Sequence, residues 1–398
     1  MTITLKNLSD FVDQTREDMV EWRRYIHQNP ELSFHEEKTS QFVYETLQSF
    51  GNLKVTRPTK TSVMARLVSE YPGKTVAFRA DMDALPIQEE NTFEFISKNP
   101  GVMHACGHDG HTAILLSTAK ILSSLKNQIK GEVRFLFQHA EEMPPGGAIQ
   151  MVEAGVMDGV DKVIGLHFLP TMEVGSLAIG SGPMQSAVDN FDIKIIGKGG
   201  HGASPHETID SLTIAAQVVT NLQHIVSRNT DPFDTLALSV TKINGGAIDS
   251  STAYNVIPET IELGGTVRSF NTKLLGSIPN LMERVIKGIT DAHGGTYEFT
   301  YRKGYRPVIN DKQVTDDVKE SLIEAFGEEA IRKAKPIMPG EDFSEFLQKA
   351  PGTFFYIGAG NSSKGIVYPL HHPRFTIDED ALAIGVKAFI NIAFKLLE

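Results

Sequence analysis

The sequence holds a single cysteine among 398 residues, which excludes an internal disulfide and gives no sign of secretion. Basic residues are also few: 38 Lys and Arg stand against 49 Asp and Glu, and the net charge of −11 disfavours nucleic acid as a partner. The most apolar late stretch, 381–394, contains Lys387 and is too short to cross a bilayer. The first residues show no basic segment followed by an apolar run. These absences predict a cytoplasmic protein that binds neither nucleic acid nor membrane.

The length of 398 residues favours two domains, because single hydrophobic cores rarely grow past about 250–300 residues. The amino-terminal part alternates amphipathic helices with apolar strands at 62–68, 75–78, 133–137 and 162–166. Such alternation predicts an α/β domain with a largely parallel sheet. Between these strands and the last part of the chain, the order changes to βαββαβ, which is the split-βαβ (ferredoxin-like) unit. We therefore expect a discontinuous α/β domain, 1–185 and 302–398, interrupted by a small domain, 186–301.

Hydrophobic periodicity also predicts where individual elements begin and end. One helix is expected over 8–28 and another over 112–125, so that Cys106 and the histidines after it lie on a loop. The strand 162–166 is expected to end at His167. In the small domain, a helix over 204–228 is expected to start at a capping box, Ser204-Pro205-His206-Glu207.

The stretch Met103-His104-Ala105-Cys106-Gly107-His108-Asp109-Gly110-His111 holds the only cysteine and three of the thirteen histidines. A thiolate and imidazoles packed this densely suit a transition metal. Cys106 and His108 are separated by one glycine, so both can reach the same site. The alternative for a lone cysteine is an inert buried thiol. Metal ligation is favoured here because further polar clusters follow the predicted strands.

Those clusters supply carboxylates and more imidazoles. Glu141 and Glu142 follow an apolar strand, and one of them could bind metal while the other acts as a base toward water. His167 follows another strand, where an unpaired polar side chain is costly. Of the adjacent His371 and His372, only one is expected to be a ligand, and His371 is preferred because His372 immediately precedes a proline.

Asp81 and Asp83 alternate at the end of a third strand, and one of them could hold a ligating histidine in the correct tautomer. In the small domain, 197–202 matches G-x-G-x-x-G, so a nucleotide-dependent oxidoreductase has to be considered. We disfavour it because His201 sits where the backbone should approach a pyrophosphate. Asn255 and Arg268 lie at the ends of neighbouring strands, and Arg268 offers two-pronged recognition of a carboxylate.

In combination, these motifs resemble the aminoacylase and hippurate hydrolase family of dinuclear metallo-amidohydrolases, which includes the indole-acetyl-amino-acid hydrolases. The resemblance extends over essentially the whole chain, through 23–32, 79–86, 103–111, 139–142, 200–205, 265–268, 340–343 and 370–373. It implies a catalytic three-layer α/β domain interrupted by a lid domain through which the protein forms a homodimer.

The resemblance also implies roles for the candidate residues. The ligands of two divalent ions per subunit would be Cys106, His108, Glu142, His167 and His371. Glu141 would be the general base, and His201 would reach the reacting carbonyl, often from the partner subunit. Asn255 and Arg268 would contact the substrate. The ions could be Zn, Mn, Co or Ni, all of which suit a thiolate with imidazoles and carboxylates.

The expected activity is metal-dependent hydrolysis of the amide bond of N-acyl amino acids, such as N-acetyl or N-benzoyl derivatives, by metal-activated water. A dipeptidase or aminopeptidase on the same scaffold is the alternative enzyme, and it would need a site for a free α-amine. A metal-binding dimer without turnover is the alternative from another class. Glu141, which is not needed as a ligand, argues against it.

Overall fold

The computed structural model describes residues 5–246 and 254–397. Over these residues the chain divides into two compact units. The first comprises Met1–Met184, Val308–Pro336 and Asp342–Glu398, and the second comprises Gln185–Pro307 and Ile337–Glu341. The second unit therefore includes a short return segment near residue 340, in addition to the inserted stretch that the sequence indicates.

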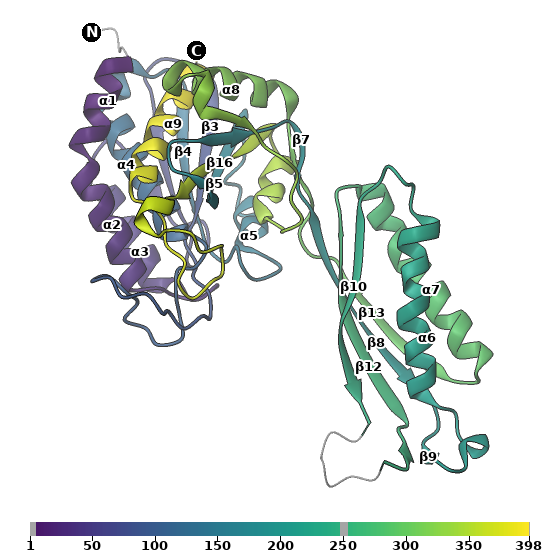
Figure 1. Cartoon of the computed structure of the whole chain (residues 1–398). Coiled ribbons are helices and arrows are strands. Elements are labelled where there is room, and N and C mark those ends of the chain that lie inside the picture. Colours follow the sequence, from purple (N-terminus) through teal and green to yellow (C-terminus); the bar gives the residue numbers. More distant parts are fainter. Residues whose placement is uncertain (1–4, 247–253, 398) are drawn as a thin grey trace. The chain divides into compact units, whose positions relative to one another are not determined.

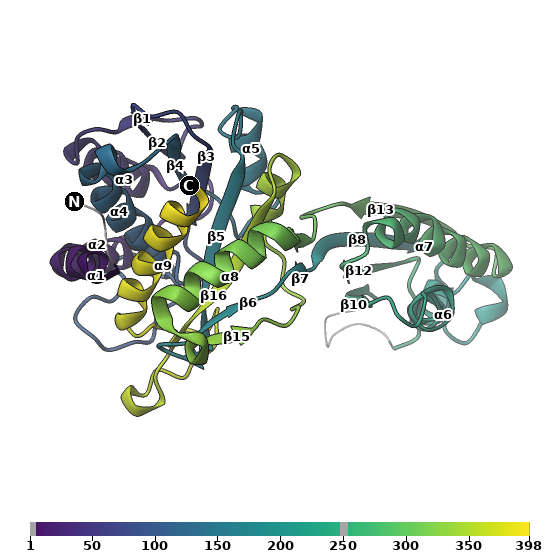
Figure 2. The ribbon, with the colours of Figure 1, turned by 90° about the horizontal axis from the view of Figure 1, so that it is seen from above.

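The described residues of the first unit form an eight-stranded sheet in the order β1-β2-β4-β3-β5-β16-β6-β15, whose strands are labelled in part in Figure 1 and fully in Figure 2. Its strands are β1 (Lys54–Thr56), β2 (Val63–Val68), β3 (Thr75–Asp81), β4 (Glu132–Gln138), β5 (Lys162–Glu173), β6 (Leu177–Ile179), β15 (Ile331–Lys333) and β16 (Gly352–Gly360). The central strands β4, β3, β5 and β16 are parallel to one another. The expected largely parallel sheet is confirmed, with antiparallel pairs toward both edges.

Helices cover both faces of this sheet (Figure 2). They are α1 (Leu5–Gln14), α2 (Arg16–Gln28), α3 (Glu37–Ser49), α4 (His108–Ser124), α5 (Gly147–Glu153), α8 (Lys312–Phe326) and α9 (Asp380–Leu397), with short turns η1 (Lys126–Gln128), η4 (Glu328–Ala330), η5 (Asp342–Gln348) and η6 (Ser362–Lys364). Phe168 of β5 contacts α4 at Gly110, whereas Gly165 of the same strand faces Phe343 of η5. Because strand side chains alternate between faces, α4 and η5 lie on opposite sides, as the three-layer architecture requires.

The second unit has a four-stranded antiparallel sheet among its described residues, in the order β10-β12-β8-β13. Its elements are β8 (Ala187–Ile196), β9 (Gly200–His201), η2 (Pro205–Glu207), α6 (Ser211–His224), η3 (Ile225–Asn229), β10 (Leu236–Gly245), β11 (Val256–Ile257), β12 (Thr260–Ser269), α7 (Thr272–Ala292) and β13 (Thr296–Arg302). A separate core, including Ile193, Val218 and Met282, fills the space between the sheet and the two long helices. The βαββαβ order is confirmed. β7 (Gly182–Gln185) and β14 (Val308–Asn310) form a further two-stranded pair.

Several expected boundaries were wrong, and three of them have a cause that the contacts show. The first helix is interrupted at Thr15, whose hydroxyl donates to the carbonyl oxygens of Phe11 and Val12. The strand β5 continues past His167 to Glu173, because it remains paired with β16. In the second unit, Asp210 caps α6 by accepting from the backbone N–H groups of Leu212 and Thr213, so the helix starts later than the predicted capping box.

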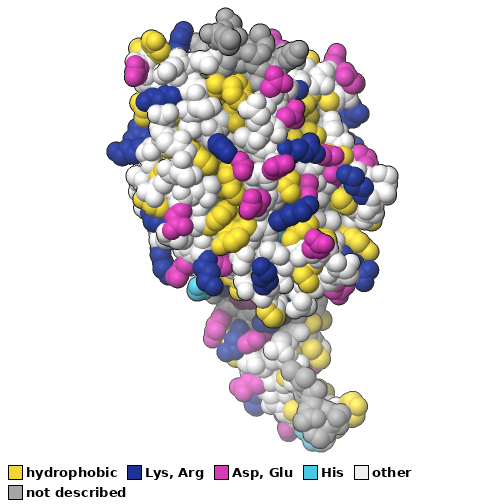
Figure 3. All heavy atoms as spheres, turned by 90° about the vertical axis from the view of Figure 1, so that its left-hand side faces the viewer, with side chains coloured by type: hydrophobic (Ala, Val, Ile, Leu, Met, Phe, Trp, Pro, Cys, Tyr) yellow, Lys and Arg dark blue, Asp and Glu magenta, His cyan; other side chains and the backbone are white. Residues whose placement is uncertain are grey.

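None of the helices in the described part of the chain is long and apolar enough to cross a membrane. On the face drawn in Figure 3, basic and acidic side chains are interspersed. Among the described residues, basic and acidic side chains pair across elements, for example Arg24 with Glu379, at 2.7 Å between Nη2 and Oε2. A face of mixed charge is typical of a solvated surface and unlike the basic stripe of a nucleic-acid-binding protein.

Candidate metal centre

The candidate site lies where the parallel strands of the first unit end. β3 ends at Asp81, β4 ends shortly before Glu141, and β5 carries His167 midway along its length, just past the residues that pair with β3. The helix α4 begins at His108, so His108 and His111 stand on its first turn and not on the expected loop. Functional groups of open α/β sheets gather at this edge. The fold therefore brings together clusters that are far apart in the sequence.

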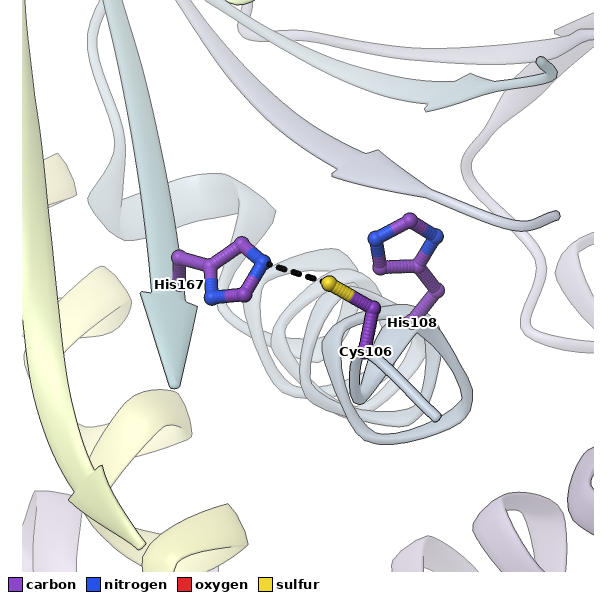
Figure 4. Close-up of side chains that lie close together, drawn as sticks. All are labelled: Cys106, His108 and His167. Carbon is purple, nitrogen blue, oxygen red and sulfur yellow. Dashed lines mark hydrogen bonds between the residues drawn. The ribbon is translucent and has the colours of Figure 1, made fainter. Parts of the chain in front are cut away.

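The start of α4 packs unusually close to β5. Gly107 has a φ of 96°, and a Cβ at Gly110 would lie 2.6 Å from the Phe168 ring. Glycines at these positions allow the helix to begin against the strand. Because they are not apolar side chains, hydrophobic periodicity does not reveal where the helix starts. The close approach places Cys106 Sγ 3.3 Å from His167 Nε2, with His108 beside them (Figure 4).

Asp83 fixes the orientation of His108. The Nδ1 atom of His108 lies 2.9 Å from the carbonyl oxygen of Asp83 and 3.2 Å from its Oδ1 atom. Asp83 Oδ2 accepts from the backbone N–H of Glu142 at 3.0 Å, which ties the same carboxylate to the acidic turn. His108 Nε2 is thereby directed into the site, and it makes no hydrogen bond within the described residues.

His371 reaches this site from the far end of the chain. Its backbone N–H donates to the carbonyl oxygen of Ala105, directly before Cys106, at 2.8 Å. Its Nε2 atom lies 3.2 Å from Glu142 Oε1, which is 3.9 Å from His108 Nε2. The loop that carries His371 is thus docked onto the segment that carries the cysteine.

His111 is in the cluster, but both of its ring nitrogens are occupied. Nδ1 lies 2.7 Å from Asp81 Oδ1, and Nε2 accepts the backbone N–H of Phe168 at 3.1 Å. A neutral imidazole held in this way has no lone pair left for a metal. Asp81 is held in turn by the buried Arg79, at 2.5 Å between Nη1 and Oδ2.

The predicted ligands form two overlapping groups. The ligand atoms of Cys106, His108 and His167 lie within 4.8 Å of one another, as do those of Cys106, Glu142 and His371. A buried thiol with imidazoles and a carboxylate is a donor set for divalent transition metals. The buried Nε2 atom of His108, which makes no hydrogen bond within the described residues, fits this interpretation.

The electrostatics of the site also favour a cation. Burial by itself would lower the pKa of His108, but the carboxylates of Asp81 and Asp83 outweigh it and raise that pKa to about 10. Burial, and then the carboxylates of Glu142 and Glu141, raises the pKa of the Cys106 thiol well above its usual range. Without a metal, both groups therefore hold protons where a divalent ion would place positive charge.

These pKa shifts predict how metal affinity depends on pH. Binding at neutral pH has to release protons from Cys106 and His108, so the affinity should rise with pH by up to about tenfold per pH unit for each proton released. Cobalt(II) titrated into metal-free protein at pH 6.5, 7.0 and 7.5 would show this, together with a sulfur-to-cobalt charge-transfer band. Cys106→Ser should lose the band and half of the pH dependence. A pH-independent affinity would contradict the assignment of these ligands.

The three remaining predicted residues lie in the second unit. His201, on β9, has its Nε2 atom 3.1 Å from the Asn255 amide nitrogen. Arg268 stands near the end of β12, half-buried, and donates to the hydroxyl of Thr266. His201 and Asn255 are thus brought together beside the two-stranded pair β9 and β11, whereas Arg268 lies on the four-stranded sheet, at the end of β12 away from that pair.

Sequence reasoning missed the buried groups behind the ligands. Arg79 donates to Gln138 at 2.8 Å and to Asp342 at 3.0 Å, in addition to Asp81. A charged residue inside an apolar strand has to be paired, and that was the available signal for Arg79. Glu36, which is also fully buried, carries no comparable signal in its local pattern.

Comparison with known proteins adds an independent finding. Residues 77–395 match the model of peptidase family M20/M25/M40. An N-acyl-L-amino acid amidohydrolase of Geobacillus stearothermophilus is 63% identical over 77% of this chain and 82% of its own. Thermostable carboxypeptidase 2 of Saccharolobus solfataricus is 41% identical over 98% of both. The crystal structure of the Bacillus subtilis YXEP protein, described as a dinuclear metal binding peptidase, has 34% identity and a TM-score of 0.83 over 97% of this chain and 99% of its own.

Proposed function

Since this chain belongs to peptidase family M20/M25/M40, we propose that it hydrolyses the amide bond of N-acyl amino acids, with Glu141 as the general base. It is a metal-dependent amidohydrolase, and the similarity to an N-acyl-L-amino acid amidohydrolase supports the substrate class. The proposed ligands of two divalent ions are Cys106, His108, Glu142, His167 and His371. Zn, Mn, Co and Ni all suit this donor set.

One observation carries the proposal: two adjacent carboxylates stand at the cluster. Glu142 lies among the ligand atoms, 3.2 Å from His371 Nε2. Glu141 is buried beside it, and a carboxylate oxygen of Glu141, a carboxylate oxygen of Glu142 and a ring nitrogen of His108 all lie within 4.8 Å of one another. A protein that only binds metal needs just the carboxylate that ligates the ion, whereas a hydrolase needs a second carboxylate to accept a proton from water.

The residues can then be assigned to steps. Divalent ions, when bound, polarise the scissile carbonyl and make a water molecule acidic enough to react near neutral pH. Glu141 accepts the proton of that water and returns it to the leaving amine nitrogen. Asp83 keeps the ring of His108 oriented throughout, by its contacts of 2.9 and 3.2 Å to Nδ1.

Substrate recognition falls to the second unit. We assign the substrate carboxylate to Arg268, because a guanidinium can bind it by two parallel hydrogen bonds. Burial lowers the pKa of Arg268, and Asp189 only partly offsets this, so a carboxylate would replace part of its lost solvation. We assign the reacting carbonyl to His201 and Asn255, whose side chains contact each other.

These assignments require a homodimer. β12 runs from the neighbourhood of His201 to Arg268, and the distance from Thr260 to Arg268 is about 26 Å at 3.3 Å per residue. An N-acetyl amino acid is only about 7 Å long, the length of two extended residues. One copy of the second unit therefore cannot supply both contacts to one substrate. A partner subunit that provides His201 and Asn255 resolves the conflict.

A substrate panel with defined metal content tests this function. N-acetyl and N-benzoyl amino acids should be hydrolysed by the metal-loaded protein, and chelation should abolish the activity. Dipeptides with a free α-amine should be poor substrates, whereas N-acylated peptides with a free carboxylate should be accepted if Arg268 binds that group. Preference for free-amine dipeptides would identify the alternative dipeptidase or aminopeptidase. A metal-loaded dimer inactive on the whole panel would support the non-catalytic alternative.

We also propose a cytoplasmic location, which cell fractionation tests.

A further inference from the structure

The turn that carries Glu141 has a strained backbone. Among the described residues, the non-glycine residues with positive φ are Phe34, Asn52, Ala140 and His371. Ala140, with a φ of 49°, directly precedes Glu141. A left-handed alanine is unfavourable and persists only when its surroundings hold it. Something must therefore fix this peptide.

The buried side chain of Glu36 is in contact with two of these strained residues. Glu36 Oε1 accepts the backbone N–H of Ala140 at 2.8 Å and that of Phe34, whose φ is 68°, at 3.0 Å. Glu36 Oε2 accepts the hydroxyl of Thr61 at 3.0 Å. Glu36 has no exposed surface and comes immediately before α3, so its carboxyl joins the start of that helix to the acidic turn.

The turn is held at further points on either side of Glu141. The carbonyl oxygen of Ala140 accepts from the N–H of Gly147 at 2.9 Å. The N–H of Glu142 donates to Asp83 at 3.0 Å. Asp83 therefore anchors the residue proposed as a ligand, and Glu36 anchors the residue that precedes the proposed base. Losing the Glu36 contact would leave Glu142 in place, but the N–H of Ala140 would lose its acceptor, and among the described residues only the bond from Gly147 to the carbonyl oxygen would still hold Ala140 in its left-handed conformation.

We propose that Glu36 is a positioning residue that directs the Glu141 carboxylate by holding Ala140 in its left-handed conformation. The proposal rests on the proposed function, because it requires Glu141 to be the base. Burial, and then Asp83, raises the pKa of Glu36 to about 7, so an uncharged side chain is compatible with its contacts. Glutamine, whose amide oxygen can accept both backbone N–H groups, should therefore replace it.

The test compares four variants of the full-length, metal-loaded protein. Glu36→Asp is one methylene too short to reach Ala140, and it should lower kcat by about 10- to 100-fold, since a displacement of about 1 Å in a catalytic group costs this much. KM and bound metal should change less than about twofold. Glu36→Gln should restore kcat to within about threefold of wild type. Thr61→Val removes the contact to the other oxygen and should leave kcat within about threefold.

The fourth variant removes the strain itself. Ala140→Gly, combined with Glu36→Asp, should recover at least about threefold in kcat over Glu36→Asp alone, because glycine adopts positive φ without the steric penalty. Equal kcat for Glu36→Asp and wild type would overturn the proposal. Equal losses of kcat in Glu36→Asp, Glu36→Gln and Thr61→Val would also overturn it, because they would indicate a purely structural role. A loss of kcat that is proportional to the loss of bound metal would overturn it as well. If Glu36→Asp does not fold, the Glu36→Gln and Thr61→Val results decide on the same criteria.

Failure of this inference can be told apart from failure of the proposed function. Glu141→Gln, measured in parallel, reports only on the base. An inactive Glu141→Gln with a fully active Glu36→Asp would refute the role of Glu36 and leave Glu141 as the base. A fully active Glu141→Gln would refute both.

Discussion

Replacing Glu141 by glutamine should lower kcat on N-acetyl amino acids by about 10²–10⁴-fold, while the protein keeps its metal. Glutamine preserves the size of the side chain and its ability to accept a hydrogen bond, but it cannot take a proton from water. The metal should stay because Cys106, His108, Glu142 and His167 are untouched, and His371 still lies 3.2 Å from Glu142. Metal analysis of the purified variant, together with initial rates, measures both quantities.

The neighbouring residue provides the matched control. Glu142→Gln makes the same chemical change one position away, but Glu142 Oε1 lies among the ligand atoms, 3.9 Å from His108 Nε2. This variant should lose metal affinity as well as activity, and excess metal should restore part of its rate. Glu141→Gln should not respond to added metal. If the two variants exchanged these behaviours, the roles of the two carboxylates would have to be exchanged as well.

The gathering of the candidate residues could be predicted from the sequence, because it follows from a general rule. Strands that run parallel point toward the same edge of a sheet, so the polar residues predicted to follow the strands near 75–78, 133–137 and 162–166 were expected to meet, although β5 in fact continues past His167. The identification of Glu142 as the ligand and Glu141 as the base did not follow from that rule. It came from the family resemblance, and the structure adds the distances around Glu142.

The choice among histidines needed contacts that no spacing reveals. His108 and His111 lie on the same turn of α4, and nothing in the sequence around them shows which one is available to a metal. They differ because Asp83 holds Nδ1 of His108 and leaves its Nε2 unpaired, while Phe168 donates to Nε2 of His111. The backbone of β5 therefore decides which histidine is available, and β5 is distant in sequence from both.

Glu36 shows a further limit of sequence reasoning. Its role depends on the left-handed conformation of Ala140, and an alanine in a sequence does not predict a positive φ. A glycine at that position would have marked the turn. The residue that holds the turn lies at the start of α3, about a hundred positions earlier, and it contacts a backbone N–H, which any non-proline residue supplies.

Mixing two inactive variants should restore activity if the lid residues act across a dimer. Glu141→Gln lacks the proposed base, and His201→Ala should be about 10²–10³-fold slower, because it lacks the proposed donor to the developing oxyanion. In a mixed dimer of the proposed kind, the site with an intact Glu141 would receive His201 from the Glu141→Gln partner. Random reassortment makes half of the dimers mixed, each with one working site, so about a quarter of wild-type activity is expected.

The matched control replaces Arg268, which lies toward the opposite end of the second unit from His201. Arg268 pairs in register with Val188, close to Gln185, where the chain enters the second unit, whereas His201 follows the far end of β8. We therefore expect Arg268 to serve its own subunit. Mixing Glu141→Gln with Arg268→Ala should then restore nothing, since the subunit that keeps its base lacks its own arginine.

The two mixtures separate the possible arrangements. Recovery of activity with His201→Ala but not with Arg268→Ala would mean that each site takes Arg268 from its own subunit and His201 from the partner. The separation of about 26 Å along β12 requires such a division if both residues contact one substrate. The reverse pattern would exchange the two residues between subunits. Recovery with neither variant, after subunit exchange has been verified by mass, would mean that His201 and Arg268 do not serve one substrate from two subunits. In that case, the distance along β12 leaves only one of them as a substrate contact, and the lower kcat/KM of the two single variants identifies it.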